Sequence, residues 1–335
     1  MIPHVDIAPL FGPACPARDA VDQAIRRAAA DPGFLTVGGH GGFPPHDAET
    51  RARLLSVFAL SAAQTRPLWR RKFEPAHANV YRGWFPLQHG ERTHKEGIDI
   101  GPDIVRPVAG DGDPLREPTP LPSEAALPGW RATAAAYYLA MEGLGHALMR
   151  AVARGLGLRE THFDAAFAGG ISTLRLIRYP ARARETLAGI AGIAAEGDGN
   201  GRHLIGAQHA DSGFVTILAQ DGVAGLQALA PDGAWLDVPP VAGSLAINFG
   251  RLLERWTGGR IRATEHRVVG NFAERRSIPF FYEPAADARI APLPLAFCPQ
   301  FEPFAYGDHL WSSMTRFVEF RGLEHARRPT GVRAA

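Results

Sequence analysis

Two side chains that can bind a metal ion lie two residues apart in the middle of the sequence. His209 and Asp211 flank a single alanine in the stretch "GAQHADSGFV". In a β-strand, residues i and i+2 point to the same face, so the imidazole and the carboxylate would leave the backbone together. Such a pair also occurs by chance on surface strands and turns. It therefore indicates a metal site only if a third ligand follows downstream.

His266 is the candidate for that third ligand, in the strand-like run "ATEHRVVGN". Two histidines and one carboxylate on adjoining strands form the facial arrangement that is typical of non-haem Fe(II) oxygenases. This arrangement leaves coordination positions open for a cosubstrate and O2. Imidazole is a suitable ligand for Fe(II), and the carboxylate of Asp211 would cancel one unit of metal charge. These residue types therefore predict a ferrous centre.

The order of the motifs resembles a known family. The runs "HADSGFVTILAQDGVAGLQ", "GAWLDVPPVAGSLAINFG" and "EHRVVGNFAERRSIPFFYEP" contain H-x-D, then a distant H, then R-x-S. They resemble the core of the isopenicillin N synthase-like family of Fe(II)/2-oxoglutarate-dependent oxygenases. The stretches "IPHVDIAPL", "GFLTVGGHG", "YRGWFP" and "KEGIDIG" resemble the N-terminal region of that family. The resemblance therefore covers most of the chain.

The resemblance implies roles for individual residues. The two histidines and the aspartate named above match the iron ligands of the family. Arg275 and Ser277 match the R-x-S pair that holds the distal carboxylate of 2-oxoglutarate. A guanidinium with a neighbouring hydroxyl is suitable chemistry for binding such a carboxylate. Tyr179, which precedes a proline, matches a tyrosine that adds a hydrogen bond at the same end.

One position departs from the family pattern. The family usually has an acid where "NFGR" has Arg251. We interpret this as a structural or surface change, because the metal triad and the R-x-S pair are intact. Asn248 in the same run falls on a family asparagine near the metal, and the sequence assigns it no role.

The reaction implied by the resemblance is the oxidation of a small-molecule metabolite by O2 and 2-oxoglutarate, with release of succinate and CO2. Hydroxylation, desaturation and ring closure all stay open, and the substrate is not indicated. Halogenation is disfavoured, because halogenating relatives have a small residue in place of Asp211. One alternative is an oxidase resembling isopenicillin N synthase, which would hold its substrate's carboxylate on Arg275 and Ser277 without 2-oxoglutarate. A second alternative is a non-catalytic metal- or ligand-binding barrel.

The elements expected around these motifs indicate a mainly β protein with flanking helices. Short apolar or alternating runs recur, separated by turn dipeptides, which favours a sandwich or barrel. These runs are 2–8, 33–39, 172–179, 214–220, 225–230, 235–240, 244–249, 265–271 and 277–284. The expected core is a double-stranded β-helix, that is, a distorted jelly roll.

Helical patterns appear at residues 47–64, with Asp47 as N-cap, at 130–156 and at 307–320. Residues 75–129 have a loop composition. We expect one catalytic unit in which an N-terminal mixed α/β region, 1–129, packs on a helix and jelly-roll core, 130–335. A long loop at 181–205 has no predicted role.

Composition excludes several other classes of protein. The formal net charge of +2 gives no argument for nucleic acid or an anionic membrane. The N-terminus does not have the pattern of a signal peptide, and no apolar run is long enough to span a bilayer. Two distant cysteines indicate free thiols in a reducing compartment. We therefore expect a cytoplasmic protein with a small-molecule substrate, a monomer with no nucleic-acid or membrane partner.

Overall fold

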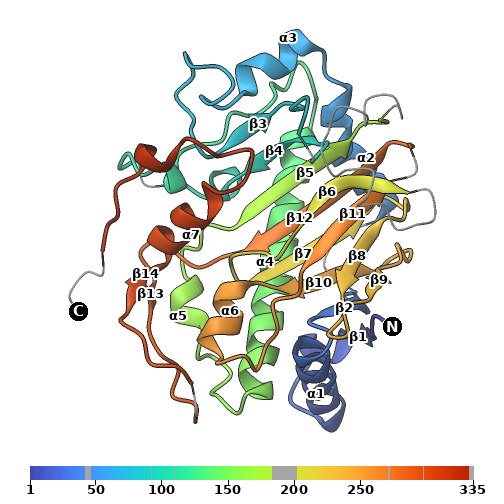
Figure 1. Ribbon diagram of the computed structural model, residues 1–335, viewed down its shortest axis with the longest axis vertical. Helices are drawn as coiled ribbons and strands as arrows, with labels where there is room; N and C mark the ends of the chain where they lie inside the picture. The colour runs from blue at the N-terminus through green and yellow to red at the C-terminus, as the bar shows by residue number, and fades with distance from the viewer. Residues whose placement is uncertain are drawn as a thin grey trace.

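The strands pair into two sheets that face each other. A computed structural model of the chain describes residues 1–41, 47–91, 93–108, 110–182, 202–270, 272–296 and 298–331. The larger sheet has eight strands (Figure 1). In spatial order these are β1 (His4–Asp6), β2 (Phe34–Gly38), β10 (Leu245–Phe249), β7 (Val215–Gln220), β12 (Arg275–Tyr282), β5 (Thr173–Tyr179), β4 (Glu96–Ile100) and β3 (Gly83–Phe85). All neighbours are antiparallel except β1 and β2.

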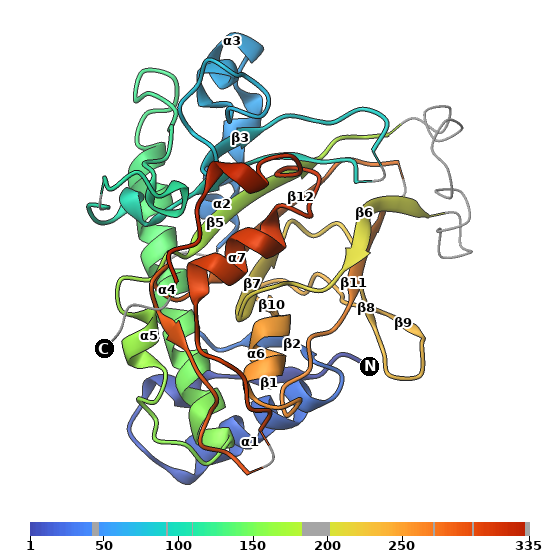
Figure 2. The same ribbon diagram turned by 60° about the vertical axis from the view of Figure 1, so that its left-hand side comes forward.

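The smaller sheet has four antiparallel strands. They are, in spatial order, β6 (His203–His209), β11 (His266–Gly270), β8 (Leu226–Leu229) and β9 (Trp235–Asp237). Figure 2 shows this sheet on one side of the larger sheet and helix α4 (Trp130–Gly155) on the other. Two facing antiparallel sheets are the layers of a jelly roll. The predicted fold class is therefore confirmed.

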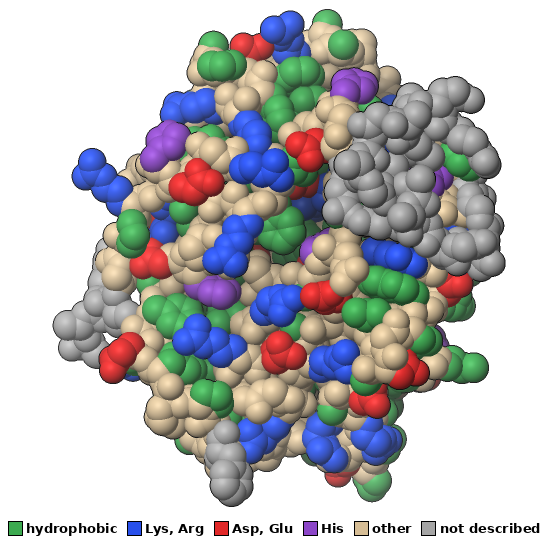
Figure 3. Space-filling view, in the orientation of Figure 1, with side chains coloured by type: hydrophobic (Ala, Val, Ile, Leu, Met, Phe, Trp, Pro, Cys, Tyr) green, Lys and Arg blue, Asp and Glu red, His purple; other side chains and the backbone are tan. Residues whose placement is uncertain are grey.

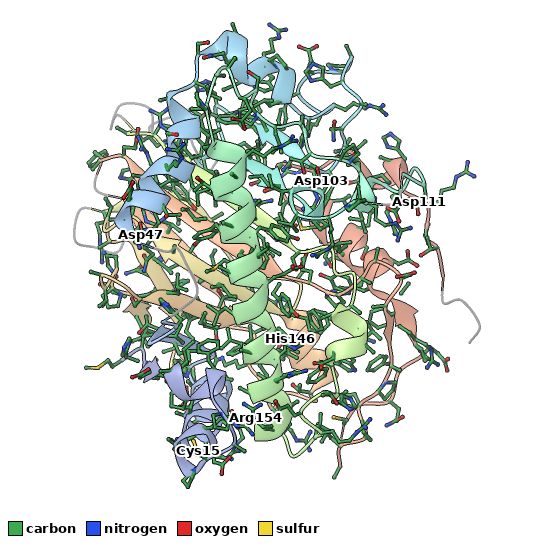
Figure 4. All side chains as sticks on the ribbon, turned by 180° about the vertical axis from the view of Figure 1, so that it is seen from behind. Cys15, Asp47, Asp103, Asp111, His146 and Arg154 are labelled. Carbon is green, nitrogen blue, oxygen red and sulfur yellow. The ribbon has the colours of Figure 1, made fainter. Side chains whose placement is uncertain are left out.

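Helix α4 covers the outer face of the larger sheet, as the rear view in Figure 4 shows. It approaches β12 closely at Gly145, where a Cβ atom would lie 2.4 Å from the Tyr282 ring. A larger residue at this position would force the helix away from the sheet. The remaining helices are α1 (Pro16–Ala30), α2 (Ala48–Leu55), α3 (Ala62–Thr65), α5 (Asp164–Phe167), α6 (Arg251–Trp256) and α7 (Tyr306–Met314). A two-stranded ribbon, β13 (Arg289–Ile290) and β14 (Phe304–Ala305), precedes α7.

The buried apolar side chains form two clusters. The larger cluster joins α1 and α4 to the sheet, and includes Ile25, Leu144 and Ile217. The smaller cluster joins side chains of the two sheets, for example Ile177 on β5 and Val268 on β11. These side chains fill part of the space between the two sheets.

The N-terminal third is more ordered than its composition predicts. Residues 75–129 were expected to be loop, yet they contain β3 and β4, which complete one edge of the larger sheet. These strands are short, and their partner β5 lies far downstream, so local composition does not reveal them. Helix α1 was also not predicted.

Two predicted helices have different bounds in the structure. The helical pattern at 47–64 divides into α2, a 3-10 turn at Ser56–Ala59, and α3. The predicted N-cap is confirmed, because the Asp47 side chain accepts a hydrogen bond of 2.8 Å from Thr50 N. The last helix ends at Met314, whereas the pattern extends to residue 320. Of the predicted loop 181–205, residues 183–201 lie outside the described residues, and β6 already begins at His203.

Within the described ranges, no helix has both the length and the apolar character needed to cross a bilayer.

Candidate active site

The three predicted metal ligands meet at one end of the smaller sheet. His209, Asp211 and His266 each offer a ligand atom, and these atoms all lie within 4.8 Å of one another. Asp211 Oδ1 is 3.7 Å from His209 Nε2 and 3.8 Å from His266 Nε2. Three atoms bound to one ion at about 2.1 Å lie roughly 3 to 4 Å apart. Only a small contraction would therefore bring these atoms to bonding distance of a shared ion.

Strand pairing places the two histidines together. His209 ends β6 and His266 begins β11, and the two residues are direct partners in the antiparallel register. Their ring centroids are 4.4 Å apart. The prediction that they lie on adjoining strands is confirmed.

Asp211 reaches the site in a different way from the one the sequence suggested. It lies beyond the end of β6, in the turn that leads to β7, so strand alternation does not position it. The start of α6 holds this turn, because Arg251 N donates to Asp211 O at 2.8 Å and Gly250 N donates to Phe214 O at 2.8 Å. A Cβ atom at Gly250 would lie 2.3 Å from Gly213 O. Only glycine permits this close approach of the two backbones.

Two further residues orient the Asp211 carboxylate. Thr216 Oγ1 and Asn248 Nδ2 both donate to Asp211 Oδ2, the latter at 2.8 Å. Thr216 on β7 and Asn248 on β10 are register partners in the larger sheet. Because Oδ2 is occupied, Oδ1 is the oxygen that faces the two imidazoles. Asn248 was named from the sequence without a role, and Thr216 was not singled out.

Backbone carbonyls fix the tautomers of the histidines. The His209 ring donates through Nδ1 to Ala207 O at 2.8 Å, and the His266 ring donates through Nδ1 to Thr264 O at 3.2 Å. A carbonyl can only accept, so Nε2 of each neutral ring carries the lone pair that a metal needs. Burial and the neighbouring His266 lower the pKa of His209 to about 4. The His209 imidazole is therefore neutral at neutral pH.

Burial opposes ionisation of Asp211, but the two imidazoles and the hydrogen bonds from Thr216 and Asn248 outweigh it and hold the pKa of the Asp211 carboxyl below its usual value. The triad thus offers two imidazole nitrogens and one anionic oxygen. This donor set fits a divalent iron.

Arg275 is a buried cation. Its side chain is 1% exposed, and Nη2 donates to Gln220 Oε1 at 3.2 Å. Nε has no hydrogen-bond partner, and no carboxylate forms an ion pair with this guanidinium in the described parts of the chain. Burial lowers the pKa of the Arg275 guanidinium. An unpaired buried cation of this kind is suited to an incoming carboxylate.

The other two predicted cosubstrate residues lie beside Arg275. Tyr179 on β5 is its register partner, and Cζ of the guanidinium is 5.4 Å from the Tyr179 ring centroid. Ser277, two residues along β12, is the register partner of Gln220 on β7. Arg276, between them, pairs instead with Glu274 at 2.6 Å and is partly exposed. Strand alternation thus places Arg276 on the other face of the strand.

A cavity of about 270 Å³ adjoins the triad. His209, Asp211 and Tyr179 line it, together with Phe281 and Lys95. Of the three consecutive aromatic residues at 280–282, Phe281 lines the cavity, whereas Phe280 and Tyr282 belong to the buried core. Figure 3 shows the molecule in the orientation of Figure 1, with a hollow near the centre of this face.

The end of α7 and the segment after it form one wall of this cavity. Met314, Phe317 and Glu319 line it, and the Phe317 ring lies edge-on to the His209 ring at 5.7 Å. Both lysines of the chain hold this segment. Lys95 Nζ is 2.8 Å from Glu319 Oε1, and Lys72 Nζ donates to the carbonyls of residues 318 and 321.

Arg251, the position at which the sequence departs from the family pattern, lies at the surface. The exposed Arg251 side chain is 3.1 Å from Glu265 Oε1. The interpretation of Arg251 as a surface change is confirmed.

Comparisons with known proteins agree with this geometry. The model of the 2OG-Fe(II) oxygenase superfamily matches residues 194–284. A 2-oxoglutarate-Fe(II) type oxidoreductase of Emericella nidulans is 30% identical over 297 residues, which cover 84% of this chain and 78% of the relative. The chain belongs to the 2OG-Fe(II) oxygenase superfamily. The predicted family, the oxidoreductase activity and the use of Fe(II), 2-oxoglutarate and O2 are thereby confirmed.

Other proteins resemble the chain over most of its length. An isopenicillin N synthase of Streptomyces clavuligerus is 29% identical over 334 residues, with 96% of this chain and 97% of the relative covered. The crystal structure of a full-length Neurospora crassa protein in complex with alpha-KG superposes with a TM-score of 0.75 at 25% identity, covering 92% of this chain and 94% of that one.

Proposed function

We propose that His209, Asp211 and His266 hold Fe(II), and that Arg275, with Ser277 and Tyr179, binds the distal carboxylate of 2-oxoglutarate. The oxygenase would then oxidise a small-molecule metabolite in the adjoining cavity. The observation that supports this most strongly is the convergence of two backbone-oriented imidazoles on the free oxygen of Asp211. If the cluster served only the fold, there would be no reason for the Nε2 lone pair of both histidines to point at the same carboxylate oxygen.

The residues around the site would have separate roles. Bound Fe(II) and 2-oxoglutarate together supply the chemistry that activates O2 for oxidation of a C–H bond. Asp211 supplies the negative charge that retains the metal, and its two hydrogen-bond donors keep it from rotating. Arg275 selects and orients the dicarboxylate, and the segment at 314–319 excludes water from the reacting end of the cavity.

The principal test measures O2 consumption and succinate release with Fe(II), with and without 2-oxoglutarate, over a panel of metabolites. We expect both signals to require 2-oxoglutarate. The Asp211→Ala variant should lose Fe(II) binding and O2 consumption, whereas the exposed Asp237→Ala variant should retain both. Retention of stoichiometric Fe(II) by Asp211→Ala would contradict the assigned ligand set.

Arg275 provides a separate test of the cosubstrate site. A hydrogen bond to a charged group contributes about 1.5 to 3 kcal/mol, so Arg275→Leu should raise the KM for 2-oxoglutarate roughly 10- to 100-fold or more. The neighbouring Arg276→Leu variant removes the same charge from the other face of the strand and should leave this KM unchanged. Equal effects of the two variants would show that only net charge matters.

A second candidate function is an oxidase of the isopenicillin N synthase type. The observation in its favour is the match to that enzyme over 96% of this chain and 97% of the relative. In that case Arg275 and Ser277 would hold a carboxylate of the substrate. O2 consumption that proceeds without 2-oxoglutarate and yields no succinate would establish this alternative.

The monomeric state, the cytoplasmic location and the division of the chain at residue 129 stay predictions. Size-exclusion chromatography with light scattering would test the first of them.

A further inference from the structure

Among the buried ionisable groups that line the cavity, Glu283 has no part in the function proposed above. Glu283 directly follows β12, whereas Arg275 begins that strand, so the two groups lie at opposite ends of it. The Glu283 side chain is 6% exposed, and Oε2 has no hydrogen-bond partner among the described residues. Burial of a carboxyl group without its full set of partners costs stability. Glu283 is therefore poorly explained as a residue that serves the fold.

Glu283 lies close to the metal-binding turn. A Cβ atom added at Gly213, two residues after Asp211, would lie 3.4 Å from Glu283 Oε1 and 3.2 Å from the Tyr306 hydroxyl. A ligand held by Glu283 would thus lie within the same cavity that His209 and Asp211 line.

The charged neighbours of Glu283 already have partners of their own. Arg82 donates to Thr173 Oγ1 at 2.5 Å and to a backbone carbonyl at 2.8 Å. Arg175 donates to both carboxylate oxygens of Asp99, at 2.5 and 2.7 Å. Burial raises the pKa of the Glu283 carboxyl to about 7, and Arg82, Tyr306 and Arg175 oppose this rise only in part. Above neutral pH the group is a carboxylate that can accept a further hydrogen bond.

The surroundings restrict what can donate that bond. Two buried guanidinium groups near Glu283 disfavour a cationic ligand such as an ammonium group. Aromatic rings line the cavity and favour a flat ligand, since they offer faces and edges for stacking. These rings belong to Tyr81, Tyr179, Phe214, Phe281 and Phe317.

We propose that Glu283 is the residue that selects the substrate, by accepting a hydrogen bond from a neutral, planar N–H group. The substrate class is then an amide, an imide or a nitrogen heterocycle. This inference rests on the proposed function, because it assigns the cavity beside the iron ligands to the substrate. Glu283 would fix the ligand at one end and so decide which C–H bond faces the metal.

The test compares compounds that differ only in the N–H group. Succinimide is paired with N-methylsuccinimide, and benzamide with N,N-dimethylbenzamide. Binding of each is measured by calorimetry to the full chain at about pH 8, without O2, after Fe(II) and 2-oxoglutarate have been titrated in. We expect the N–H member of at least one pair to bind about tenfold or more tightly than its methylated partner.

Variants then assign that preference to Glu283. Glu283→Gln keeps the shape and removes the charge, so the preference should fall to about threefold or less; Glu283→Leu should abolish it. Glu91→Gln removes a carboxylate that lines the same cavity and is 3.8 Å from Arg321, and the preference should persist in it. Tighter or equal binding of the methylated compounds to the unmodified chain would overturn the proposal. So would the absence of any binding at millimolar concentration, or an equal loss in Glu91→Gln.

Failure of the proposed function gives a different result. A chain that binds neither Fe(II) nor 2-oxoglutarate contradicts the oxygenase site itself. In that case the binding of the paired compounds is measured on the chain without Fe(II) and 2-oxoglutarate. A preference for the N–H compound that is lost in Glu283→Leu would still support the role of Glu283.

Discussion

At the scale of single residues, the side chains proposed to bind the metal differ from those that orient the ligands. The proposed ligand set consists of three side chains, but the direction of Asp211 depends on Thr216 and Asn248. Partners of this kind influence metal affinity without touching the metal. They are also the residues for which a sequence offers the least signal, since neither type is unusual in a strand.

Loss of the Asn248 amide should weaken the metal site without removing a ligand. We expect Asn248→Ala to reduce Fe(II) affinity about 10- to 100-fold, because Asp211 then lacks one of its two donors. The same substitution at Asn79, whose amide donates to Pro118 O on the exterior, is the control. Fe(II) titration of the two variants measures the difference. An unchanged affinity in Asn248→Ala would mean that Thr216 alone holds the carboxylate.

Glu283 should also affect stability in a pH-dependent way. Its pKa is raised from 4.5 to about 7 in the folded protein. The folded chain therefore binds more protons than the unfolded chain between these two pH values, and stability falls as the pH rises through this window. At about 1.4 kcal/mol for each pH unit, the loss is roughly 3 kcal/mol.

Replacement by glutamine should remove this loss. We expect Glu283→Gln to raise the free energy of unfolding by up to roughly 3 kcal/mol at about pH 8, and the gain should shrink as the pH falls from about 7 toward 4.5. Urea unfolding at several pH values measures it. Glu91→Gln should change stability by less than about 0.5 kcal/mol. A Glu283→Gln variant that is less stable at about pH 8 would show that the carboxylate serves the fold.

At the scale of elements, the segment after α7 is held by the buried Phe320 ring, which packs on Tyr81, and by the Lys95–Glu319 ion pair. Burial opposes ionisation of Glu319, but Lys95 and Arg175 outweigh it and lower the pKa of Glu319 to about 2. The Lys95–Glu319 ion pair is thus fully formed at neutral pH. Lys95 directly precedes β4, and Glu319 lines the cavity. The ion pair therefore ties this wall of the cavity to β4.

Removal of Lys95 should release that wall. We expect Lys95→Met to leave Glu319 buried without its partner and to speed amide hydrogen exchange in residues 315–321 by about tenfold or more. Exchange in β12 and α4 should not change. Arg66→Met, which removes an exposed ion pair of 2.8 Å with Glu74, serves as the control. Unchanged exchange in 315–321 would indicate that Lys72 and the buried Phe320 ring are sufficient to hold the segment.

At the scale of the whole molecule, the N-terminal region joins the jelly roll by strand pairing, β2 on β10 and β4 on β5, and also by the packing of α1 on α4. Figure 4 shows Arg154 near the end of α4 that lies beside α1. Its guanidinium donates to both oxygens of Asp22 on α1, at 2.6 and 2.7 Å, and Asp22 is 3% exposed. A buried carboxylate held by one cation makes the two helices depend on each other.

Breaking this ion pair should destabilise the protein without affecting the site. We expect Arg154→Met to lower the free energy of unfolding by about 3 to 5 kcal/mol, because Asp22 is then a buried charge without a partner. Arg150, also on α4, forms a more exposed ion pair with Asp164 of α5, and Arg150→Met should cost less than about 1 kcal/mol. Denaturant unfolding and Fe(II) titration of both variants check this. A parallel loss of iron affinity in Arg154→Met would mean that the helices also shape the site.

The chemistry of the site and most of the jelly-roll strands could be predicted from the order of the residues. The order of H-x-D, a distant histidine and R-x-S along the chain is enough to predict a metal triad, and strands such as β7 and β12 carry local apolar patterns. Three features needed the folded chain: the orientation of Asp211, the burial of Glu283 without its full set of partners, and the closure of the cavity by Lys95. Each of these depends on contacts between segments distant in the sequence, and burial and hydrogen-bond partners have no local pattern.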